Sequence, residues 1–567
     1  MGCNVPIQRC QPLWRLSFQS LHSRVLNLVT ALIRLPDFPI AGFGRYSLLL
    51  GATIGLLSCG GKAPCTRCDT LVIAAVGEPS SLVPPVVFET VGRDISDQIF
   101  QRLADLPAGH SPGDPTAYRP ALAASWERVD SLTWRFHLQP KARWSDGQAV
   151  TAADVVFSFE AYADSVLDAQ ARSAIAGHIT ATAADSATAL IHFDHSYPEQ
   201  LYDATWQVRI LPAHIWSSVP RAQWANDTAG AHLVGSGPYR LAHWERGQSL
   251  ELVARSTSTP IQHVFWRFAA DPEAALNLVL AHEADLLETL TTPERAAKVS
   301  ADSTLSVIPY PSAAYGYVGY NLKSGLLTSA VLRRALNQAV DRGAIATQLF
   351  GSGAKAPPGP LSQLLWIWDD SVKVLAADSA AAAAELDRAG WRAGSDGIRR
   401  QGARKLAFDL LVPGTSAVRK RAAEILQERW RAIGVAVSVT AVDFPVFQQR
   451  LASGKFDSYV ATYLDEPSPR GLADQWTTAG IGVLNFGRYS NPAFDRQFAA
   501  AAAEADPARA RVLWRQALDT LNADAPALFL FAPVNRAAAS RRLGALEIDP
   551  WSWVSGLSSW KLSGPGK

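Results

Sequence analysis

The amino-acid sequence has no cysteine after position 68 and no histidine after His282. The long body of the chain therefore has neither a disulfide framework nor a thiolate metal site, and its C-terminal half has no imidazole ligand. We expect no metal and no cofactor there. The chain also lacks a large excess of either charge, because it has 53 Lys and Arg residues and 51 Asp and Glu residues. A nucleic-acid binder would show a clear basic excess, so we expect no nucleic-acid partner.

Motifs of several enzyme classes are missing from the sequence. His282-Glu283 is not followed by the second histidine of H-E-x-x-H, and there is no phosphate-binding G-x-x-x-x-G-K segment. Gly235-Ser236-Gly237 lacks the spacing of the G-x-S-x-G nucleophile elbow. These absences favour a binding protein over an enzyme.

The N-terminal region contains a short apolar run that leads into a cysteine. Leu48 to Leu57 follows Arg45 and precedes Ser58-Cys59. The run is shorter than the ~20 residues that a membrane-spanning helix needs, but it suits the apolar region of an export signal. We therefore predict a lipoprotein signal in residues 1–58, with cleavage before Cys59, a lipid on its sulfur, and a body anchored to the membrane outside the cytoplasm, in the periplasm or at the cell surface. The alternative is an ordinary buried apolar segment that contains a cysteine.

Residues 59–68 are expected to form a tether between the lipid and the folded body. Cys65 and Cys68 form a C-x-x-C in this segment. A redox role would need the N-terminus of a helix after a strand to lower the pKa of one thiol. A tether offers no such helix, so a local disulfide or no role fits these cysteines better.

Composition indicates a folded body with more than one domain. About 500 residues follow Cys59, and the chain is 48% hydrophobic and 18% charged. This length exceeds one ordinary core, so we expect two or three domains. The 18 Trp and 13 Tyr suit a ligand-binding cleft, although most of them are expected in the core.

Local patterns predict an α/β fold. The clearest helix covers 417–433, with one apolar stripe and Gly434 as its left-handed end. Thr151 is predicted to begin a helix, because Asp154 can complete a capping box. Further helices are predicted over 271–280 and 508–521, and strands over 71–76, 132–138, 264–268, 406–412 and 435–442. The helix 417–433 with the strands on either side forms a βαβ unit, which implies a parallel pair.

Four ordered blocks of the sequence resemble one protein family. They are Arg119 to Glu127 continuing through Trp144-Ser145-Asp146-Gly147 to Ser158, then Val234-Gly235-Ser236-Gly237-Pro238-Tyr239, then Tyr320-Asn321-Leu322 with Val331 to Arg342, and finally Ile433-Gly434-Val435 with Phe456-Asp457. In this order they resemble the family-5 solute-binding proteins of ABC importers, a group that binds dipeptides, oligopeptides or nickel. The resemblance covers almost everything from Leu71 to the C-terminus and agrees with the lipoprotein signal.

The resemblance implies a periplasmic-binding-protein-like α/β fold of type II. Two lobes would close on a ligand, and the first lobe would carry an extra inserted subdomain. Carried onto this sequence, lobe I comprises 69–105, 200–318 and 540–567, the inserted subdomain comprises 106–199, and lobe II comprises 319–539. The implied partners are a peptide or other small solute and the subunits of an ABC permease, and we expect a monomer.

The resemblance also assigns a candidate ligand strand. In peptide-binding members, a lobe II strand pairs with the ligand backbone, and an acidic residue meets the free amine. The matching residues here are Ala461, Thr462 and Tyr463 for the pairing and Asp465 for the amine. Relatives often carry Gly and Trp where this chain has Ala461 and Thr462, and Asp where it has Ser468. The alternative is that Asp465 caps the turn before Pro467.

Other candidate ligand contacts come from both lobes. Glu78 opens a segment that resembles the first-lobe ligand loop, although the family's Asp at its end is Val83 here. Tyr315, Tyr317 and Tyr320 lie at the expected crossover between the lobes and are candidates to face the cleft. Trp476 is a candidate pocket ring. Core packing is the alternative for each of these aromatic residues.

Three functions remain open at this point. The leading hypothesis is a lipoprotein that captures a small solute, expected to be a peptide, and delivers it to a permease. A nickel-chelate or other non-peptide binder is a second hypothesis of the same class. The third is a surface hydrolase, which would need a nucleophile–base pair or a metal cluster, and the sequence shows neither.

Overall fold

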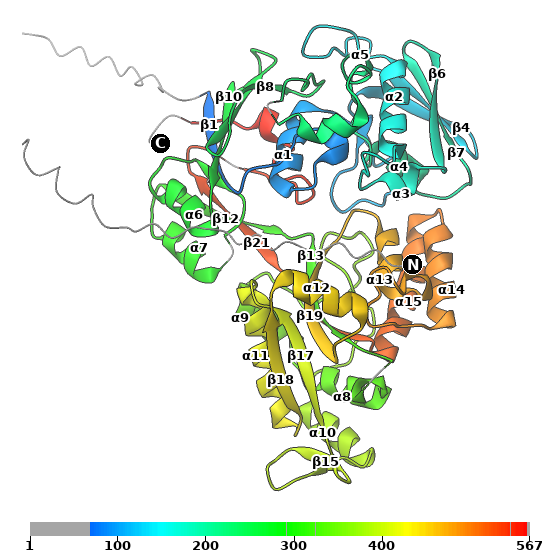
Figure 1. The fold of residues 1–567 in the computed structure, drawn as a ribbon, viewed down its shortest axis with the longest axis vertical. Helices are drawn as coiled ribbons and strands as arrows, with labels where there is room; N and C mark the ends of the chain where they lie inside the picture. Colours follow the sequence, from blue (N-terminus) through cyan, green and yellow to red (C-terminus); the bar gives the residue numbers. More distant parts are fainter. Residues whose placement is uncertain (1–68, 229, 291, 324, 545, 564–567) are drawn as a thin grey trace, which may run out of the picture. The chain divides into compact units, whose positions relative to one another are not determined.

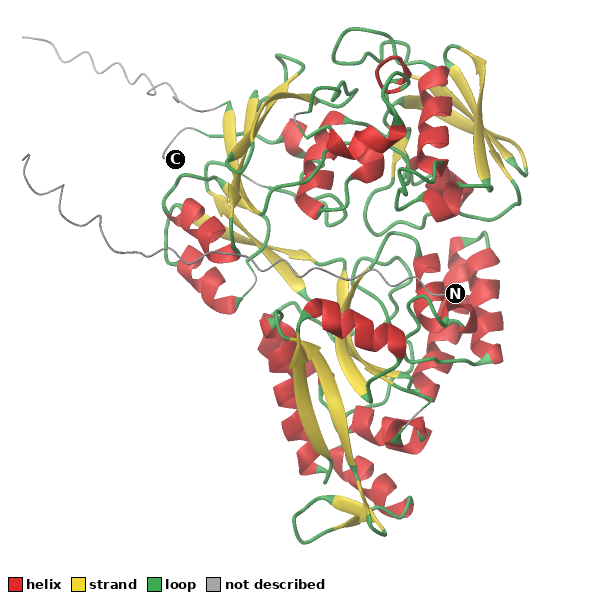
Figure 2. Ribbon diagram, in the orientation of Figure 1, coloured by secondary structure: helices red, strands yellow, loops and turns green. Residues whose placement is uncertain are grey.

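Two large β-sheets and one smaller antiparallel sheet organise the chain (Figure 1). The computed structural model describes residues 69–563 except 229, 291, 324 and 545, all within the unit Pro64–Lys567. The predicted signal, Cys59, Cys65 and Cys68 lie outside the described residues. Helices and strands are interspersed along this part of the chain (Figure 2), which confirms the α/β fold class.

The first sheet has seven strands and gathers segments from both ends of the described chain. Parallel pairing joins β1 to β10 and β11, whereas the outer pairs are antiparallel. The strands in spatial order are β12 (Leu305–Pro311), β21 (Val534–Ser540), β11 (Leu286–Leu287), β1 (Thr70–Val76), β10 (His263–Ala269), β9 (Ser249–Ala254) and β8 (Tyr239–Glu245). The predicted strands 71–76 and 264–268 are therefore confirmed as β1 and β10.

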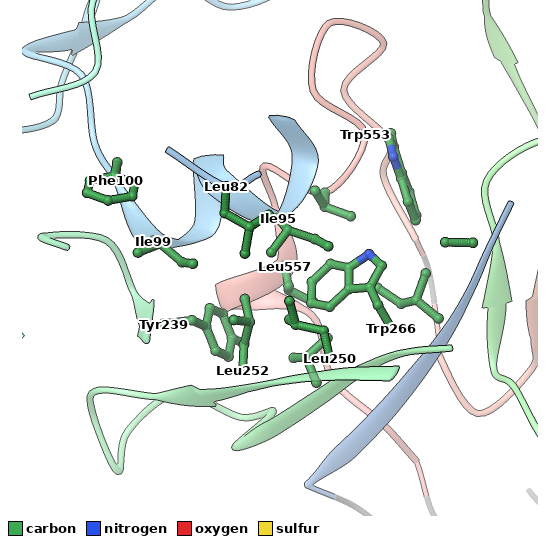
Figure 3. Packing of buried hydrophobic residues seen from close by; sticks show 14 of the residues in the cluster. Leu82, Ile95, Ile99, Phe100, Tyr239, Leu250, Leu252, Trp266, Trp553 and Leu557 are labelled. Atoms are coloured by element: carbon green, nitrogen blue, oxygen red, sulfur yellow. The ribbon is translucent and has the colours of Figure 1, made fainter. Parts of the chain in front are cut away.

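Bulky side chains fill the core on one face of the first sheet (Figure 3). Trp266 of β10 and Leu250 of β9 are fully buried there. Helix α1 (Thr90–Ile99) adds Ile95 and Ile99, and the C-terminal segment adds Trp553. The chain end is thus held to the first sheet by apolar burial, and by a 2.7 Å hydrogen bond that the Trp553 indole donates to Asp94 of α1.

A four-stranded antiparallel sheet forms the core of the expected inserted subdomain. Its strands in spatial order are β4 (Ala123–Asp130), β5 (Thr133–Leu138), β7 (Thr188–Phe193) and β6 (Ile179–Asp185). Helix α2 (Ala152–Ala163) packs against it. The predicted capping box is present, because the Asp154 carboxylate accepts the backbone N–H of Thr151 at 2.8 Å.

The second large sheet has five strands and contains the predicted βαβ unit. The strands in spatial order are β18 (Ala436–Val442), β17 (Ala407–Pro413), β19 (Ser458–Leu464), β13 (Ala314–Tyr320) and β20 (Ala527–Phe531). Helix α11 (Ala417–Ala432) connects β17 to β18, and these strands pair in parallel. Gly434 follows α11 at φ +84°, where an added Cβ would also lie 2.6 Å from Arg399. The unit forms as the sequence predicts.

The chain crosses between the two large sheets through two short segments. Residues 312–313 join β12 to β13, and residues 532–533 join β20 to β21. The Ser312 backbone N–H donates to the Pro533 carbonyl at 3.3 Å, so the two crossings lie side by side. Both fall earlier than the sequence predicts. Strand β13 belongs to the second sheet, although the predicted lobe I extends to residue 318. Strand β21 belongs to the first sheet, although the predicted lobe II extends to residue 539. Buried residues up to Ile210 also pack with the subdomain core. The other domain limits stay predictions.

The remaining helices surround these sheets. They are α3 (Arg172–Ile175), α4 (Gln200–Thr205), α5 (Ala213–Trp216), α6 (Pro272–Leu280), α7 (Pro293–Ser300), α8 (Ala330–Gln338), α9 (Arg342–Phe350), α10 (Ser379–Arg388), α12 (Phe444–Ser453), α13 (Ala473–Trp476), α14 (Pro492–Ala503) and α15 (Pro507–Asp524). Short strands also form β2 (Ala104–Asp105) with β3 (Arg119–Pro120), and β14 (Arg392–Ala393) with β15 (Arg399–Gln401) and β16 (Arg404–Lys405). Over the described ranges, none of these helices is both long enough and apolar enough to cross a membrane.

Candidate functional site

Strand β19, which contains Ala461, Thr462 and Tyr463, has one free edge near its end. It pairs with β13 along its whole length, but its pairing with β17 stops at Tyr459. The Asp465 backbone N–H donates to the Ala313 carbonyl at 2.7 Å. Because backbone direction alternates along an antiparallel pair, Thr462 and Leu464 direct their backbone groups away from β13. Both residues are exposed, so this edge is open to another extended chain.

Asp465 follows β19 directly and is buried, with 8% of its surface exposed. Its carboxylate accepts the backbone N–H of Ser362 at 2.6 Å. Burial raises the pKa of Asp465 to about 8, and hydrogen bonding by the backbone and side chain of Ser362 opposes only part of the rise. No cationic side chain forms an ion pair with it within residues 69–563 outside the four gaps. The alternative that Asp465 caps its own turn is wrong. The backbone N–H that its carboxylate accepts belongs to Ser362, in a loop 103 residues away.

Two further buried polar groups lie in the same part of the second sheet. Tyr315 of β13 donates its hydroxyl to the Gln475 side-chain oxygen at 2.6 Å, and Tyr315 is an electrostatic neighbour of Asp465. The Gln475 amide nitrogen is buried without a hydrogen-bond partner in the described chain. Buried polar groups usually have partners, so this cluster retains hydrogen-bonding capacity that a polar ligand can use.

The predicted aromatic residues divide between the two faces of the second sheet. Tyr317 packs its ring 5.6 Å from that of Tyr315 and 5.5 Å from that of Trp476, all on the face near Asp465. Tyr320 lies on the opposite face and donates to Asn337 at 2.8 Å. All four rings are buried, and the three tyrosines lie inside β13 rather than at the crossover. In this structure these four aromatic rings therefore pack in the core, as the alternative to a ligand contact predicts.

Glu78 lies in the loop after β1, and all the partners of its carboxylate come from the neighbouring β8–β9 hairpin of the first sheet. Its carboxylate accepts the Trp244 indole N–H at 2.8 Å and the Gly247 backbone N–H at 3.0 Å. It also pairs with the Arg246 guanidinium at 2.9 Å. Its charge is already compensated, which makes Glu78 a less suitable partner for a ligand cation than Asp465. Its role in binding stays a prediction.

An ion-pair cluster that the sequence does not predict lies just beyond Asp465. Arg470 donates two hydrogen bonds to the Asp203 carboxylate at 2.8 and 2.9 Å and pairs with Glu199. Asp203 lies in α4 and Glu199 directly precedes it, and α4 packs with the subdomain core. The side chains of Asp203 and Glu199 are 3% and 8% exposed. This cluster of Arg470, Glu199 and Asp203 joins the β19 loop to the subdomain, and no local pattern indicates a pairing over such a separation.

Two hollows of the described surface, of about 590 and 760 Å³, do not coincide with these residues. One cavity of about 590 Å³ lies between the end of α1 and the C-terminal segment, lined by residues such as Arg102, Trp206 and Asp549. None of the predicted site residues lines it. We place the candidate site at β19 and Asp465 because a buried carboxyl group without a counter-charge and a free strand edge are direct features of recognition, whereas volume alone is not. Among the described residues there is also no cluster of three or more groups able to hold a metal.

Comparisons with known proteins agree with this geometry. The profile of "Bacterial extracellular solute-binding proteins, family 5 Middle" matches residues 117–482. Protein XP55 of Streptomyces lividans is 27% identical over 474 residues, covering 82% of this chain and 83% of that protein. The oligopeptide-binding protein AppA of Bacillus subtilis is 22% identical, covering 87% of this chain and 91% of that protein.

Solved structures show the same fold. The structure of AppA in complex with a nonapeptide has a TM-score of 0.70 at 22% identity, covering 88% of this chain and 100% of that one. NikZ from Campylobacter jejuni in complex with Ni(L-His) has a TM-score of 0.71 at 21% identity, covering 87% and 100%. The family profile covers well over half of the chain. The chain therefore belongs to the family-5 extracellular solute-binding proteins, and it is a binding protein rather than an enzyme.

Proposed function

We propose that this protein captures a peptide between its two lobes and delivers it to the permease of an ABC importer. The observation that carries this proposal is the buried Asp465 carboxylate, which has no cationic partner in the described chain. A buried charge without a counter-charge is costly. The ammonium group of a peptide supplies that counter-charge and a charge-assisted hydrogen bond.

The free edge of β19 supports the same ligand. Thr462 and Leu464 offer backbone donors and acceptors beyond the end of the pairing with β17. A peptide added along this edge would gain affinity through its backbone, whatever its side chains. Leu464 is 63% exposed beside this edge and would give an apolar surface to a ligand side chain.

The proposed location follows from the N-terminal sequence. Lipidation of Cys59 would hold the binding domain outside the cytoplasmic membrane, next to its permease. The crossings at 312–313 and 532–533 would serve as the hinge for closure, since two short adjacent strands of chain can absorb a rotation.

Mass spectrometry of the ligand that co-purifies with the protein tests this function. The proposal predicts peptides with free amines, and the same peptides should raise the melting temperature of ligand-free protein by mass action. Recovery of a nickel chelate, or of a solute without an amine, would contradict it. Conversion of an added peptide mixture to shorter products would indicate the hydrolase alternative instead.

A further inference from the structure

The cluster of Arg470, Glu199 and Asp203 contains two carboxylates and only one cation. The Arg470 guanidinium donates to both Asp203 oxygens and, through Nε, to Oε2 of Glu199. The Ser468 hydroxyl donates to the same Glu199 oxygen, and the Tyr197 hydroxyl donates to Asp203 at 2.8 Å. No second Lys, Arg or His pairs with either carboxylate among the residues that the structure describes. With both carboxylates ionised, the cluster would hold one negative charge without a counter-charge.

The surroundings of the cluster do not supply the missing positive charge. Charged side chains on the neighbouring segments have partners of their own, which are Glu504 with Arg509, Asp194 with His195, and Arg128 with Ser196. The other titratable neighbours are phenols or further carboxylates, namely Tyr118, Tyr197, Tyr202, Asp114 and Glu466. Burial raises the pKa of each of these tyrosines, so they stay neutral. The excess negative charge is therefore costly to keep buried.

A second buried cluster has the opposite ratio of charges. Asp97 pairs with two guanidiniums, those of Arg102 at 3.2 Å and Arg209 at 2.8 Å. Burial favours the neutral form of Asp97, but the two guanidiniums outweigh burial and lower its pKa. Burial also raises the pKa of Glu199, where one shared guanidinium opposes the rise and the Asp203 carboxylate adds to it. The ratio of guanidiniums to carboxylates thus decides which form each cluster favours.

The two sides of the cluster come from different parts of the fold. Ser468 and Arg470 lie between β19 and α13, whereas Glu199 directly precedes α4 and Asp203 lies in it. Separation of these parts would return both carboxylates to water, where the pKa of Glu199 takes its ordinary value of 4.5. At pH values above 4.5, the joined state therefore binds a proton more readily than the separated state.

We propose that closure of the lobes takes up one proton at Oε1 of Glu199, so that a fall in pH favours the closed arrangement. Oε1 accepts neither the Ser468 bond nor the Arg470 bond, so it can carry the proton while Oε2 keeps both. The cluster then holds one guanidinium, one carboxylate and one neutral carboxyl group, and its charges balance. This inference rests on the lobe closure of the proposed function and adds a proton to that step.

Solution scattering of the ligand-free protein at pH 5, 6, 7 and 8 tests the inference. Wild type should have a smaller mean radius of gyration at pH 5 than at pH 8. The ratio of closed to open molecules should change by up to about tenfold per pH unit between 4.5 and the raised pKa. Glu199→Gln resembles the neutral carboxyl group, so it should keep the small radius at every pH. An equal radius of wild type from pH 5 to pH 8 would overturn the inference.

The matched control is Glu504→Gln. Glu504 lines the same small hollow as Glu199, but it pairs with Arg509 at 2.9 Å and lies outside the cluster. Its substitution should leave the pH dependence of wild type unchanged. A large radius of Glu199→Gln at every pH, with an unchanged melting temperature, would show that closure requires the ionised carboxylate, which would also overturn the inference.

The number of protons bound on closure gives a second, independent measurement. Calorimetric titration with free alanine peptides, in two buffers of different ionisation enthalpy, counts these protons between pH 6 and pH 8. Wild type should take up more protons than Glu199→Gln, by up to one per molecule, whereas Asp465 contributes equally to both and cancels in the comparison. Equal proton uptake by the two proteins would contradict a proton at Glu199.

The inference and the proposed function fail separately, because scattering without ligand needs no peptide. If no peptide binds but wild type closes at low pH and Glu199→Gln is closed throughout, the proposed ligand is wrong and the inference stands. If peptides bind but the radii of the two proteins change in parallel with pH, another group such as His195 titrates. That result would overturn the inference and leave the proposed function intact.

Discussion

The Asp465 carboxylate accepts the backbone N–H of Ser362 at 2.6 Å across 103 residues of sequence. This bond fixes the loop before Ser362 against the end of β19, and it holds one carboxylate oxygen in place. The same carboxylate is buried and has no cationic partner in the described chain. Asp465 therefore combines a structural hydrogen bond with a carboxyl group whose ionised form has no counter-charge in the fold.

Substitutions of Asp465 should separate these two properties. Asp465→Asn keeps an acceptor for Ser362 and removes the ionisable group, so the free energy of unfolding at pH 7 should stay the same or rise. Asp465→Ala removes the ionisable group too but leaves the buried N–H unpaired, so it should be less stable than Asp465→Asn by about 1–3 kcal/mol. Urea unfolding of ligand-free protein measures both. Equal destabilisation by the two substitutions would mean that the fold requires the charge itself.

The pH dependence of stability should carry the signature of Asp465. Its pKa rises from 3.8 to about 8 in the folded protein. Between these values the folded state retains a proton that the unfolded state has lost, so the free energy of unfolding falls as pH rises from about 4 to 8. The slope from this one group is at most about 1.4 kcal/mol per pH unit. Urea unfolding at pH 5, 6, 7 and 8 should show this slope in wild type, relative to Asp465→Asn. Parallel curves for the two proteins would contradict the raised pKa.

The cluster of Arg470, Glu199 and Asp203 should favour the closed arrangement of the lobes. Arg470→Met would leave two buried carboxylates without a guanidinium, which favours separation of the loop from the subdomain. We expect a larger radius of gyration in solution scattering without ligand, and weaker ligand binding by roughly tenfold. Arg421→Met is the exposed control. An unchanged scattering profile with only a lower melting temperature would show that the cluster stabilises the fold without influencing closure.

Much of the local structure could be predicted from neighbouring residues. The capping box of Thr151 and Asp154 and the end of α11 at Gly434 depend on groups only a few positions apart. The apolar stripe of α11 likewise determines which side packs on the sheet, because Ala422, Leu426 and Trp430 recur at helical spacing. Such features need no knowledge of the rest of the fold.

The candidate site depends on contacts that no local pattern encodes. The tyrosines of β13 are predicted to lie at the crossover between the lobes. The strand lies instead inside the second sheet, between β19 and β20. Its glycines make this possible, since a Cβ on Gly319 would lie 2.3 Å from the Tyr459 ring. Tyr320 lies three positions after Tyr317, so the alternation of side chains along the strand places it on the opposite face. The Ser362 and Arg470 contacts similarly join segments more than one hundred residues apart.

Lipid attachment can be tested independently of the ligand. Cys59→Ser removes the sulfur that the predicted lipid would occupy, so the protein should move from the membrane fraction to the soluble fraction. Cell fractionation followed by immunoblotting measures this change, and Cys65→Ser is the control that should stay membrane-bound. A wild-type N-terminus that proves unprocessed before Cys59 would contradict the lipoprotein prediction.

Recognition of the ligand amine by Asp465 is tested most directly by calorimetric titration with free and N-acetylated alanine peptides. Wild type should bind the free peptides at least about tenfold more tightly, because acetylation removes the charge that the buried carboxylate requires. Asp465→Asn should lose about 1–3 kcal/mol of binding free energy for the free peptides and should no longer distinguish the two forms. Equal affinity of wild type for free and acetylated peptides would contradict amine recognition and point to a ligand other than a peptide.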